Sequence, residues 1–278
     1  MTGISTVYKI IRPANLLITF FSIVVGAVIC KTGSVPILII FYAAVSGALA
    51  AAGGNVINDI FDVEIDRINR PGRPLPSGGI SLRKAFLLYI ILIILSAASA
   101  SRVSFEALLI DISALMLLFL YSYKFKKIIL LGNFTVAILT GFAFIYGGIA
   151  VNNYKDAVIP AAFAFLINFI REIVKDMEDV DGDLKNGISS FPHRYGFLKT
   201  KIMITTLSLL LIAATFYPFI LRIYSIEYLL IVAVLVDPVL IYIINVLFKD
   251  DSPVGLNRIS LILKINMVFG LAAIYLGK

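Results

Sequence analysis

Long apolar runs separated by short polar segments fill almost the whole chain. Nine such runs fall at residues 14–30, 37–57, 86–100, 105–121, 128–151, 157–174, 202–221, 228–248 and 259–276. A helix needs about 20 apolar residues to cross a bilayer, and the shorter runs reach this length if the flanking residues continue the helix. The pattern therefore predicts an all-α integral membrane protein with nine transmembrane helices.

Composition agrees with this pattern. Of the 278 residues, 60% are hydrophobic and the mean hydropathy is +0.99, whereas soluble domains are about 45–50% apolar. Because Cys30 is the single cysteine, the chain has no intrachain disulfide and no cysteine metal site. The first apolar run follows Lys9, Arg12 and Pro13, so we interpret it as a retained span and not a cleaved signal peptide. With no linker or low-complexity segment, we expect a single domain over residues 1–278.

The basic residues predict the orientation of the chain in the membrane. With the N-terminus in the cytoplasm and the C-terminus outside, sixteen of the 24 Lys and Arg residues lie in inside segments and five in outside segments. The net charge of +7 is then concentrated on the cytoplasmic face, where it can meet anionic lipid headgroups and anionic substrates. Positive charge spread over short interhelical connections does not favour nucleic acid as a partner.

Two long polar connections, roughly residues 59–84 and 176–200, repeat one another at an offset of 117 residues. Each begins where an apolar run ends and carries aspartates at i, i+3 and i+7: Asp59, Asp62 and Asp66 in the first, and Asp176, Asp179 and Asp183 in the second. The repeat predicts a two-fold arrangement in which the two copies face one another.

The spacing of these acids indicates a metal site. On a helix, the three aspartates of each set fall within about 60° of arc, together with Asn55 in the first copy and Glu172 in the second, whereas Glu64 and Asp181 point away. Like charges at this spacing repel, and acids at the end of a membrane span are candidates for a functional site. Mg²⁺, which binds carboxylate and phosphate oxygens, removes the repulsion and stabilises a leaving diphosphate. We therefore predict Mg²⁺ at all six aspartates.

These residues carry a resemblance to a known family. Residues Asn58 to Asp66 read N-D-x-x-D-x-x-x-D, and residues Asn69 to Gly78 read N-R-P-x-R-P-x-P-S-G. Both stretches, and the second aspartate set, resemble the UbiA superfamily of intramembrane prenyltransferases over essentially the whole chain. The resemblance implies nine helices around a central cavity in a multi-pass protein of the cell (plasma) membrane. It also implies an active site at the cytoplasmic face, where Mg²⁺ and a prenyl diphosphate bind and the allylic diphosphate ionises before an acceptor attacks.

The second motif indicates which class of acceptor receives the prenyl group. Residues Arg171 to Asp183 read R-E-x-x-K-D-x-E-D-x-x-G-D, which is similar to the archaeal digeranylgeranylglyceryl phosphate synthases of that superfamily. This likeness implies transfer of a geranylgeranyl group to the free glycerol hydroxyl of geranylgeranylglyceryl phosphate, an anionic lipid acceptor, in archaeal ether-lipid biosynthesis. An aromatic acceptor stays open as an alternative. An ion-coupled transporter is a remote one, because the acids lie at span ends and not at the bilayer midplane.

Roles for individual residues follow from these hypotheses. We expect Asp59, Asp62, Asp176 and Asp179 to be catalytic, with Glu172 as the candidate that accepts the hydroxyl proton. Cations grip phosphate, Arg in a bidentate manner and Lys as a point charge. The predicted substrate-binding residues are Asn55, Asn58, Arg67, Arg73, Lys124, Lys126, Lys127, Arg171 and Lys175. For the three lysines of the central connection, a role in topology alone is an equal alternative.

Overall fold

The computed structural model describes residues 3–34, 36–185 and 189–278, and in these residues the chain forms helices and no strand. Within the same ranges, nine helical segments are long and apolar enough to cross a membrane. The predicted all-α fold with nine spans is therefore confirmed, whereas the orientation of the termini and the central cavity stay predictions. The chain divides into two compact units: unit 1 comprises Met1–Lys126 and Ala143–Ala157, and unit 2 comprises Lys127–Phe142 and Val158–Lys278.

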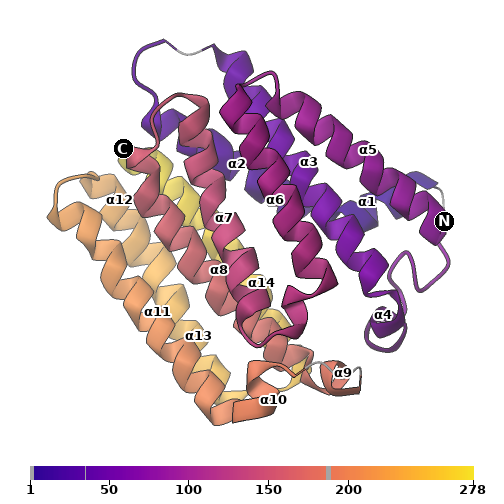
Figure 1. Ribbon diagram of the computed structural model, residues 1–278. Coiled ribbons are helices and arrows are strands. Elements are labelled where there is room, and N and C mark those ends of the chain that lie inside the picture. Colours follow the sequence, from indigo (N-terminus) through magenta and orange to yellow (C-terminus); the bar gives the residue numbers. More distant parts are fainter. Residues whose placement is uncertain (1–2, 35, 186–188) are drawn as a thin grey trace. The chain divides into compact units, whose positions relative to one another are not determined.

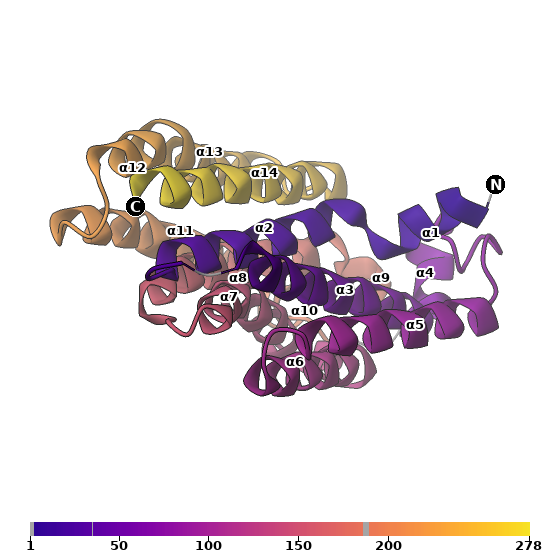
Figure 2. The same cartoon turned by 90° about the horizontal axis from the view of Figure 1, so that it is seen from above.

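Unit 1 is built around the packing of α5 along α3, which lie side by side in Figures 1 and 2. Its helices are α1 (Gly3–Ile11), α2 (Pro13–Cys30), α3 (Ile37–Phe61), α4 (Val63–Asn69), α5 (Leu82–Ala100) and α6 (Phe105–Tyr123), together with the second part of α7 (Leu131–Ala150) and a short turn at Lys155–Ala157. Val56 and Ile57 of α3 are buried against Ala85 and Tyr89 of α5. This apolar seam fixes the end of α3 that carries the first aspartates.

Glycines allow α2 and α7 to approach closely within unit 1. A Cβ added at Gly147 would lie 2.1 Å from the carbonyl oxygen of Ile23, and one added at Gly26 would lie 2.8 Å from the Cα of Phe144. Both distances are far below van der Waals contact with backbone atoms, so only glycine fits at either position. Small residues at helix interfaces are a common means of close packing in membranes.

A chain of hydrogen bonds crosses the interior of unit 1. The hydroxyls of Ser46 on α3 and Tyr146 on α7 lie 2.7 Å apart. Ser96 on α5 lies 2.8 Å from the carbonyl oxygen of Ser46 and 2.7 Å from the Asp111 carboxyl on α6. Ser46, Ser96 and Asp111 are all buried, so four helices are joined by polar contacts in an otherwise apolar layer.

Unit 2 has a large apolar core. Its helices are α8 (Val158–Glu178), α9 (Val180–Lys185), α10 (Phe191–Tyr195), α11 (Phe197–Ile220), α12 (Ile226–Ile231), α13 (Asp237–Lys249) and α14 (Pro253–Gly277), with a π-helical turn at Val232–Val236 between α12 and α13. Figure 2 shows α13 and α14 side by side. Ile170 and Ile173 of α8, Ile204 of α11, Leu240 of α13 and Ile259 of α14 are fully buried together. This core holds α8, the helix that leads to the second set of aspartates.

The spans extend beyond the apolar runs because polar caps start them earlier. The hydroxyl of Ser81 accepts a hydrogen bond from the Lys84 amide, so α5 begins at Leu82 and includes two basic residues before its apolar part. Ser252 caps α14 in the same way through the amide of Gly255, at 3.2 Å. Basic side chains at such ends keep their charged groups in water while their stems cover apolar surface. The extension of the runs by flanking helical residues is thereby confirmed.

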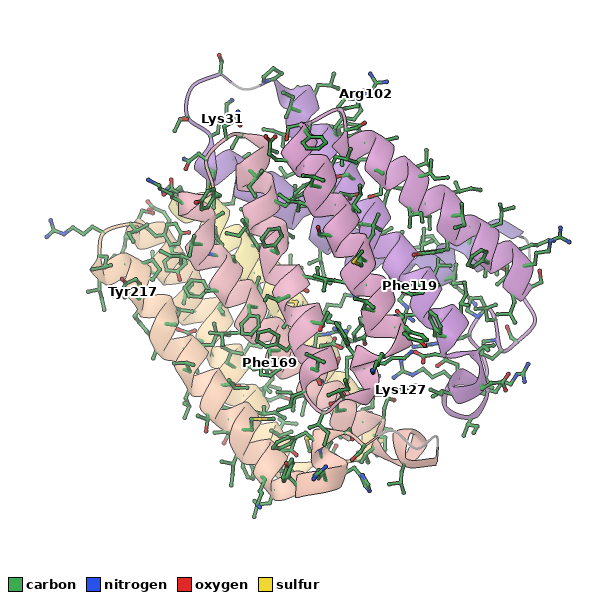
Figure 3. The ribbon with its side chains drawn as sticks, viewed as in Figure 1. Lys31, Arg102, Phe119, Lys127, Phe169 and Tyr217 are labelled. Atoms are coloured by element: carbon green, nitrogen blue, oxygen red, sulfur yellow. The ribbon has the colours of Figure 1, made fainter. Side chains whose placement is uncertain are left out.

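In unit 1, α4 and the end of α3 that carries the aspartates lie at one end (Figure 1), whereas Lys31 and Arg102 lie at the opposite end (Figure 3). The short α1, which carries Lys9, and the first turn of α5 share the end with α4 (Figure 1). Basic residues therefore concentrate at the end of unit 1 that carries the acids, which is the distribution expected of a cytoplasmic face.

Candidate active site

Each aspartate set lies where one helix breaks and a second, short helix follows. In unit 1, α3 ends at Phe61 and α4 begins at Val63, with Asp62 between them. In unit 2, α8 ends at Glu178 and α9 begins at Val180, with Asp179 between them. The two breaks are 117 residues apart, so the repeat in the sequence is also a repeat of local structure. Because the backbone amide of Asp62 still bonds the Asn58 carbonyl oxygen, at 2.9 Å, the break bends the helix without unwinding it.

Arginines hold two of the acids in unit 1. Asp59 is buried and forms an ion pair with Arg12, which precedes α2. Arg73, from the loop after α4, lies 3.5 Å from the same Asp59 oxygen and 2.5 Å from Asp66. Burial raises the pKa of the Asp66 carboxyl above its ordinary value, and the Arg73 guanidinium opposes that shift. One guanidinium thus bridges the first and third aspartates, as their common helical face predicts.

Asp62 faces a lysine from the connection after α6. Lys126 forms an ion pair with the Asp62 carboxylate, and both side chains are largely buried. One turn before Asp62, the buried Oδ1 of Asn58 has no hydrogen-bond partner among the described residues. Asn55 donates a 2.8 Å hydrogen bond to the carbonyl oxygen of Ile11. Asn58 therefore presents an open acceptor oxygen beside the carboxylates, and Asn55 supports the backbone that leads to Arg12.

Three predicted phosphate-binding cations do not join this cluster. Arg67 pairs with Glu64 at 2.8 Å, and both side chains are more than half exposed, at 61% and 71%. Lys124 and Lys127 are also exposed, in contrast to the neighbouring Lys126. An i,i+3 pair of opposite charges on an exposed helix face is a common local interaction, and it accounts for the position of Arg67. The structure thus brings Arg73 and Lys126 to the acids.

In unit 2 the acids have a different neighbour. Asn133, in the first turn of α7, donates a 2.9 Å hydrogen bond to the Asp176 carboxylate. Asp176 and Asp179 are half-buried, and the side chain of Asp183 lies outside the described part of the structure. The Asp179 amide bonds the carbonyl oxygen of Lys175 at 2.9 Å, which keeps the helical geometry as far as the break.

Glu172 lies one turn before Asp176 and is buried between cations. Arg171 donates to one of its oxygens at 3.0 Å, and Lys175 contacts both oxygens at 3.0 and 2.9 Å. The side chain of Glu172 is 8% exposed. A buried carboxylate with two cationic partners is well placed to orient both of them.

Sequence reasoning missed Arg12 and Asn133 as site residues. Arg12 is 47 residues from Asp59, and Asn133 is 43 residues from Asp176, so local spacing gives no signal for either pair. The dipeptides Arg12-Pro13 and Gly132-Asn133 also resemble UbiA sequences, and this likeness is a signal that could have identified both residues.

The donor set suits a hard cation. Three aspartates and the open oxygen of Asn58 supply only oxygen atoms in unit 1, which is the chemistry that Mg²⁺ prefers. In the part of the chain that the structure describes, no three acidic, histidine or cysteine side chains already converge on one point. Arg12, Arg73 and Lys126 lie against the carboxylates instead. Because Mg²⁺ usually binds through one or two carboxylates plus substrate phosphates, the set fits a metal that arrives with a diphosphate.

Comparison with known proteins agrees with this chemistry. Residues 19–266 match the UbiA prenyltransferase family. The digeranylgeranylglyceryl phosphate synthase of Methanocaldococcus jannaschii is 37% identical over 280 residues, which cover 100% of this chain and 97% of that protein. A solved structure of a digeranylgeranylglyceryl phosphate synthase has a TM-score of 0.77 and 37% identity, covering 100% of this chain and 99% of the other.

A more distant structure shares the fold. A UbiA homolog from Archaeoglobus fulgidus, solved with DMAPP and Mg²⁺, has a TM-score of 0.70 at 23% identity and covers 97% of this chain and 99% of its own. Both structural matches extend over both units, and the family match spans the two aspartate sets. The chain belongs to the UbiA prenyltransferase family.

Proposed function

We propose that this enzyme transfers a geranylgeranyl group from geranylgeranyl diphosphate to the free glycerol hydroxyl of geranylgeranylglyceryl phosphate, with Mg²⁺ as cofactor. The protein is a multi-pass membrane prenyltransferase, and the proposal adds its two substrates. Relatives named digeranylgeranylglyceryl phosphate synthase, 33% and 37% identical over nearly the full chain, support this choice. Membership of an enzyme family leaves no ground for the ion-coupled carrier.

The observation that carries the proposal is the pair of helix breaks at Asp62 and Asp179. Both breaks present carboxylates at the end of a membrane span, where uncompensated acids are costly. In this proposal Asp59, Asp62 and Asp66 bind Mg²⁺ in unit 1, and Asp176, Asp179 and Asp183 do so in unit 2. When bound, the metal neutralises the charge that develops on the departing diphosphate.

The cations at the acids then have a second role. Arg12, Arg73 and Lys126 each pair with a carboxylate, and a carboxylate that binds Mg²⁺ no longer needs them. Guanidinium groups grip phosphate oxygens in a bidentate manner, and an ammonium acts as a point charge. We expect these three side chains to bind the diphosphate once metal occupies the aspartates, with Asn58 as a further polar ligand.

Prenyl transfer exchanges one C–O bond for another. The C–O bond of the allylic diphosphate breaks, and diphosphate leaves with the electron pair. The glycerol hydroxyl oxygen forms the new C–O bond with the allylic carbon. Its proton passes to Glu172, the buried carboxylate beside Asp176. Such proton transfer contributes typically 10²–10⁴-fold to a rate. The active site is expected at the cytoplasmic face of the cell membrane.

An acceptor panel tests the function. Purified enzyme in detergent receives labelled geranylgeranyl diphosphate and Mg²⁺ with geranylgeranylglyceryl phosphate, with 4-hydroxybenzoate, or with no acceptor. We expect a labelled lipid product with the glycerol phosphate alone. Product only with 4-hydroxybenzoate would assign an aromatic acceptor and overturn the proposal.

A matched pair of variants tests the metal ligands. Asp62→Asn removes a carboxylate at the helix break, whereas Glu64→Gln makes the same chemical change two residues later, on an exposed side chain. We expect Asp62→Asn to lower turnover by about 10²–10³-fold, the usual effect of removing one group that stabilises transition-state charge. Glu64→Gln is expected to retain turnover within about twofold. Equal turnover in the two variants would refute the assignment.

A further inference from the structure

One face of α8, below the aspartates of unit 2, carries more hydrogen-bond donors than acceptors. Asn168, Arg171, Glu172 and Lys175 are spaced three and four residues apart, which places them within about 100° of arc on the helix. Asn168 is 5% exposed, and its Nδ2 has no hydrogen-bond partner in the described part of the chain. The same holds for the buried Nε of Arg171. Two buried donors therefore point to an acceptor that the protein itself does not supply.

The two cations on this face share one carboxylate. Glu172 is the carboxylate at this level, and Arg171 and Lys175 both bond to it. Both cations therefore lie on the face of a membrane-spanning helix that also carries the two donors without partners. Intramembrane charges are costly and mark functional sites by default.

A third cation lies at the same level on α14. Glu178 of α8 accepts a 2.7 Å hydrogen bond from Asn257 of α14, which fixes the register of these antiparallel helices. Arg171 lies seven residues before Glu178 on α8, and Lys264 lies seven residues after Asn257 on α14. Seven residues are about two helical turns in each case. Lys264 is half-buried, about 16 Å along α14 from Pro253. Lys264 thus lies at the level of Arg171, well inside a membrane span.

We propose that Asn168, Arg171, Lys175 and Lys264 form a binding site for a phosphomonoester, the headgroup of the lipid acceptor. The identity of the lipid rests on the proposed function. The presence of an anion is inferred from the unpartnered donors of Asn168 and Arg171. A phosphomonoester carries about −1.5 to −2 charges near pH 7 and three strong acceptor oxygens, which match the open donors of Asn168 and Arg171. The site extends along α8 from Lys175, next to Asp176, to Asn168, which precedes Asp176 by about 12 Å of helical rise.

This site would hold the acceptor beside Glu172. Anchoring of the phosphate by Arg171 and Lys175 brings the rest of the headgroup next to the carboxylate between them. Specificity then follows from the buried donors, since an acceptor without a phosphate leaves them unpaired, and unpaired buried donors are costly. The same donors therefore bind a glycerol phosphate and reject a neutral acceptor.

Binding without turnover tests the site. The full-length protein in nonionic detergent, with EDTA and without prenyl diphosphate, is titrated calorimetrically with dodecyl phosphate, dodecanol and inorganic phosphate. We expect dodecyl phosphate to bind and dodecanol not to bind. Asn168→Leu removes one hydrogen bond to a charged group and should lower the affinity for dodecyl phosphate by about tenfold. Arg171→Leu should lower this affinity by at least as much. Arg171→Lys, which keeps the charge, should recover part of the affinity.

Matched variants separate the site from general damage. Asn245→Leu makes the same change on an exposed amide that bonds its own helix at the Ile241 carbonyl oxygen, and it should bind as the unaltered protein does. Lys264→Met is compared with Lys201→Met, which makes the same change at a lysine that pairs with Asp251 at 2.8 Å. Asn168→Leu and the control variants Asn245→Leu and Lys201→Met should also bind geranylgeranyl diphosphate with Mg²⁺ and unfold at an unchanged temperature.

Each outcome decides one question. Equal dodecyl phosphate affinity in Asn168→Leu, Arg171→Leu and the unaltered protein overturns the site, as does equal binding of dodecanol. Inorganic phosphate that binds as tightly as dodecyl phosphate overturns the assignment to a lipid headgroup. Binding that depends on these residues, without product from geranylgeranylglyceryl phosphate, supports the site and refutes the proposed function. If product forms from geranylgeranylglyceryl phosphate but the variants bind dodecyl phosphate as the unaltered protein does, the proposed function is supported and the site is refuted.

Discussion

Replacement of Gly147 by alanine tests the packing that holds α2 against α7 in unit 1. The new Cβ would lie 2.1 Å from the Ile23 carbonyl oxygen and 2.8 Å from the Ala27 amide nitrogen, both of them backbone atoms of α2. No side-chain rotation relieves this contact, so α2 must move by about 1 Å to restore ordinary van der Waals distances, and overpacking of this kind costs about 1–3 kcal/mol. The gain in helix propensity from glycine to alanine offsets about 0.5–1 kcal/mol. The expected net loss of unfolding free energy is about 1–2 kcal/mol.

Thermal unfolding in detergent at a fixed scan rate measures this loss. At about 2–4 °C per kcal/mol for a chain of this size, the apparent Tm should fall by about 2–8 °C. Gly270→Ala, in α14, is the matched control, because a Cβ there meets no atom within 4 Å. Only the propensity gain remains in that variant, so its Tm should rise slightly. An unchanged or higher Tm for Gly147→Ala would refute the close contact.

Three further predictions concern the polar interior and the metal. Ser96→Ala removes the contacts to Ser46 and Asp111 and should lower the free energy of unfolding by about 1–2 kcal/mol, measured by the same thermal scan; an unchanged Tm would contradict it. Lys126→Met should lower turnover at least about tenfold because it removes a proposed diphosphate ligand, whereas Lys31→Met, at the opposite end of unit 1, should not. EDTA should stop prenyl transfer and added Mg²⁺ should restore it, and turnover that persists in EDTA would exclude the metal role.

The nine spans were predictable because membrane insertion selects for continuous apolar length, and this is a local property of the sequence. The ends of the spans were less predictable. The run at 86–100 begins four residues late, because Ser81 caps the helix ahead of Arg83 and Lys84 and hydropathy does not register a cap. The division into two compact units, with α7 contributing to both, depends on contacts between distant segments and leaves no local trace.

The aspartates were predictable for a similar reason. Helical periodicity brings Asp59 and Asp66 to one face, and Arg73 indeed bridges them. The incorrect predictions concern the cations that pair with these aspartates. Arg67 is adjacent to Asp66 in sequence, but on a helix the neighbour in sequence points about 100° away, and Arg67 pairs with Glu64. Asp59 pairs with Arg12, which is 47 residues away in the sequence, where periodicity gives no information.

Arg12 also makes the junction between α1 and α2 sensitive to the charge on α3. Its backbone has φ 55° and ψ 68°, a left-handed conformation that costs a residue with a side chain about 1–3 kcal/mol. Two contacts from consecutive turns of α3 compensate for this cost: Asp59 pairs with the guanidinium, and Asn55 bonds the carbonyl oxygen of Ile11 just before the junction. Any cation that displaces Arg12 from Asp59 removes one of the two restraints. The angle at which α1 leaves the bundle is therefore coupled to the occupant of that carboxylate, and a probe on α1 would report on it from outside the active site.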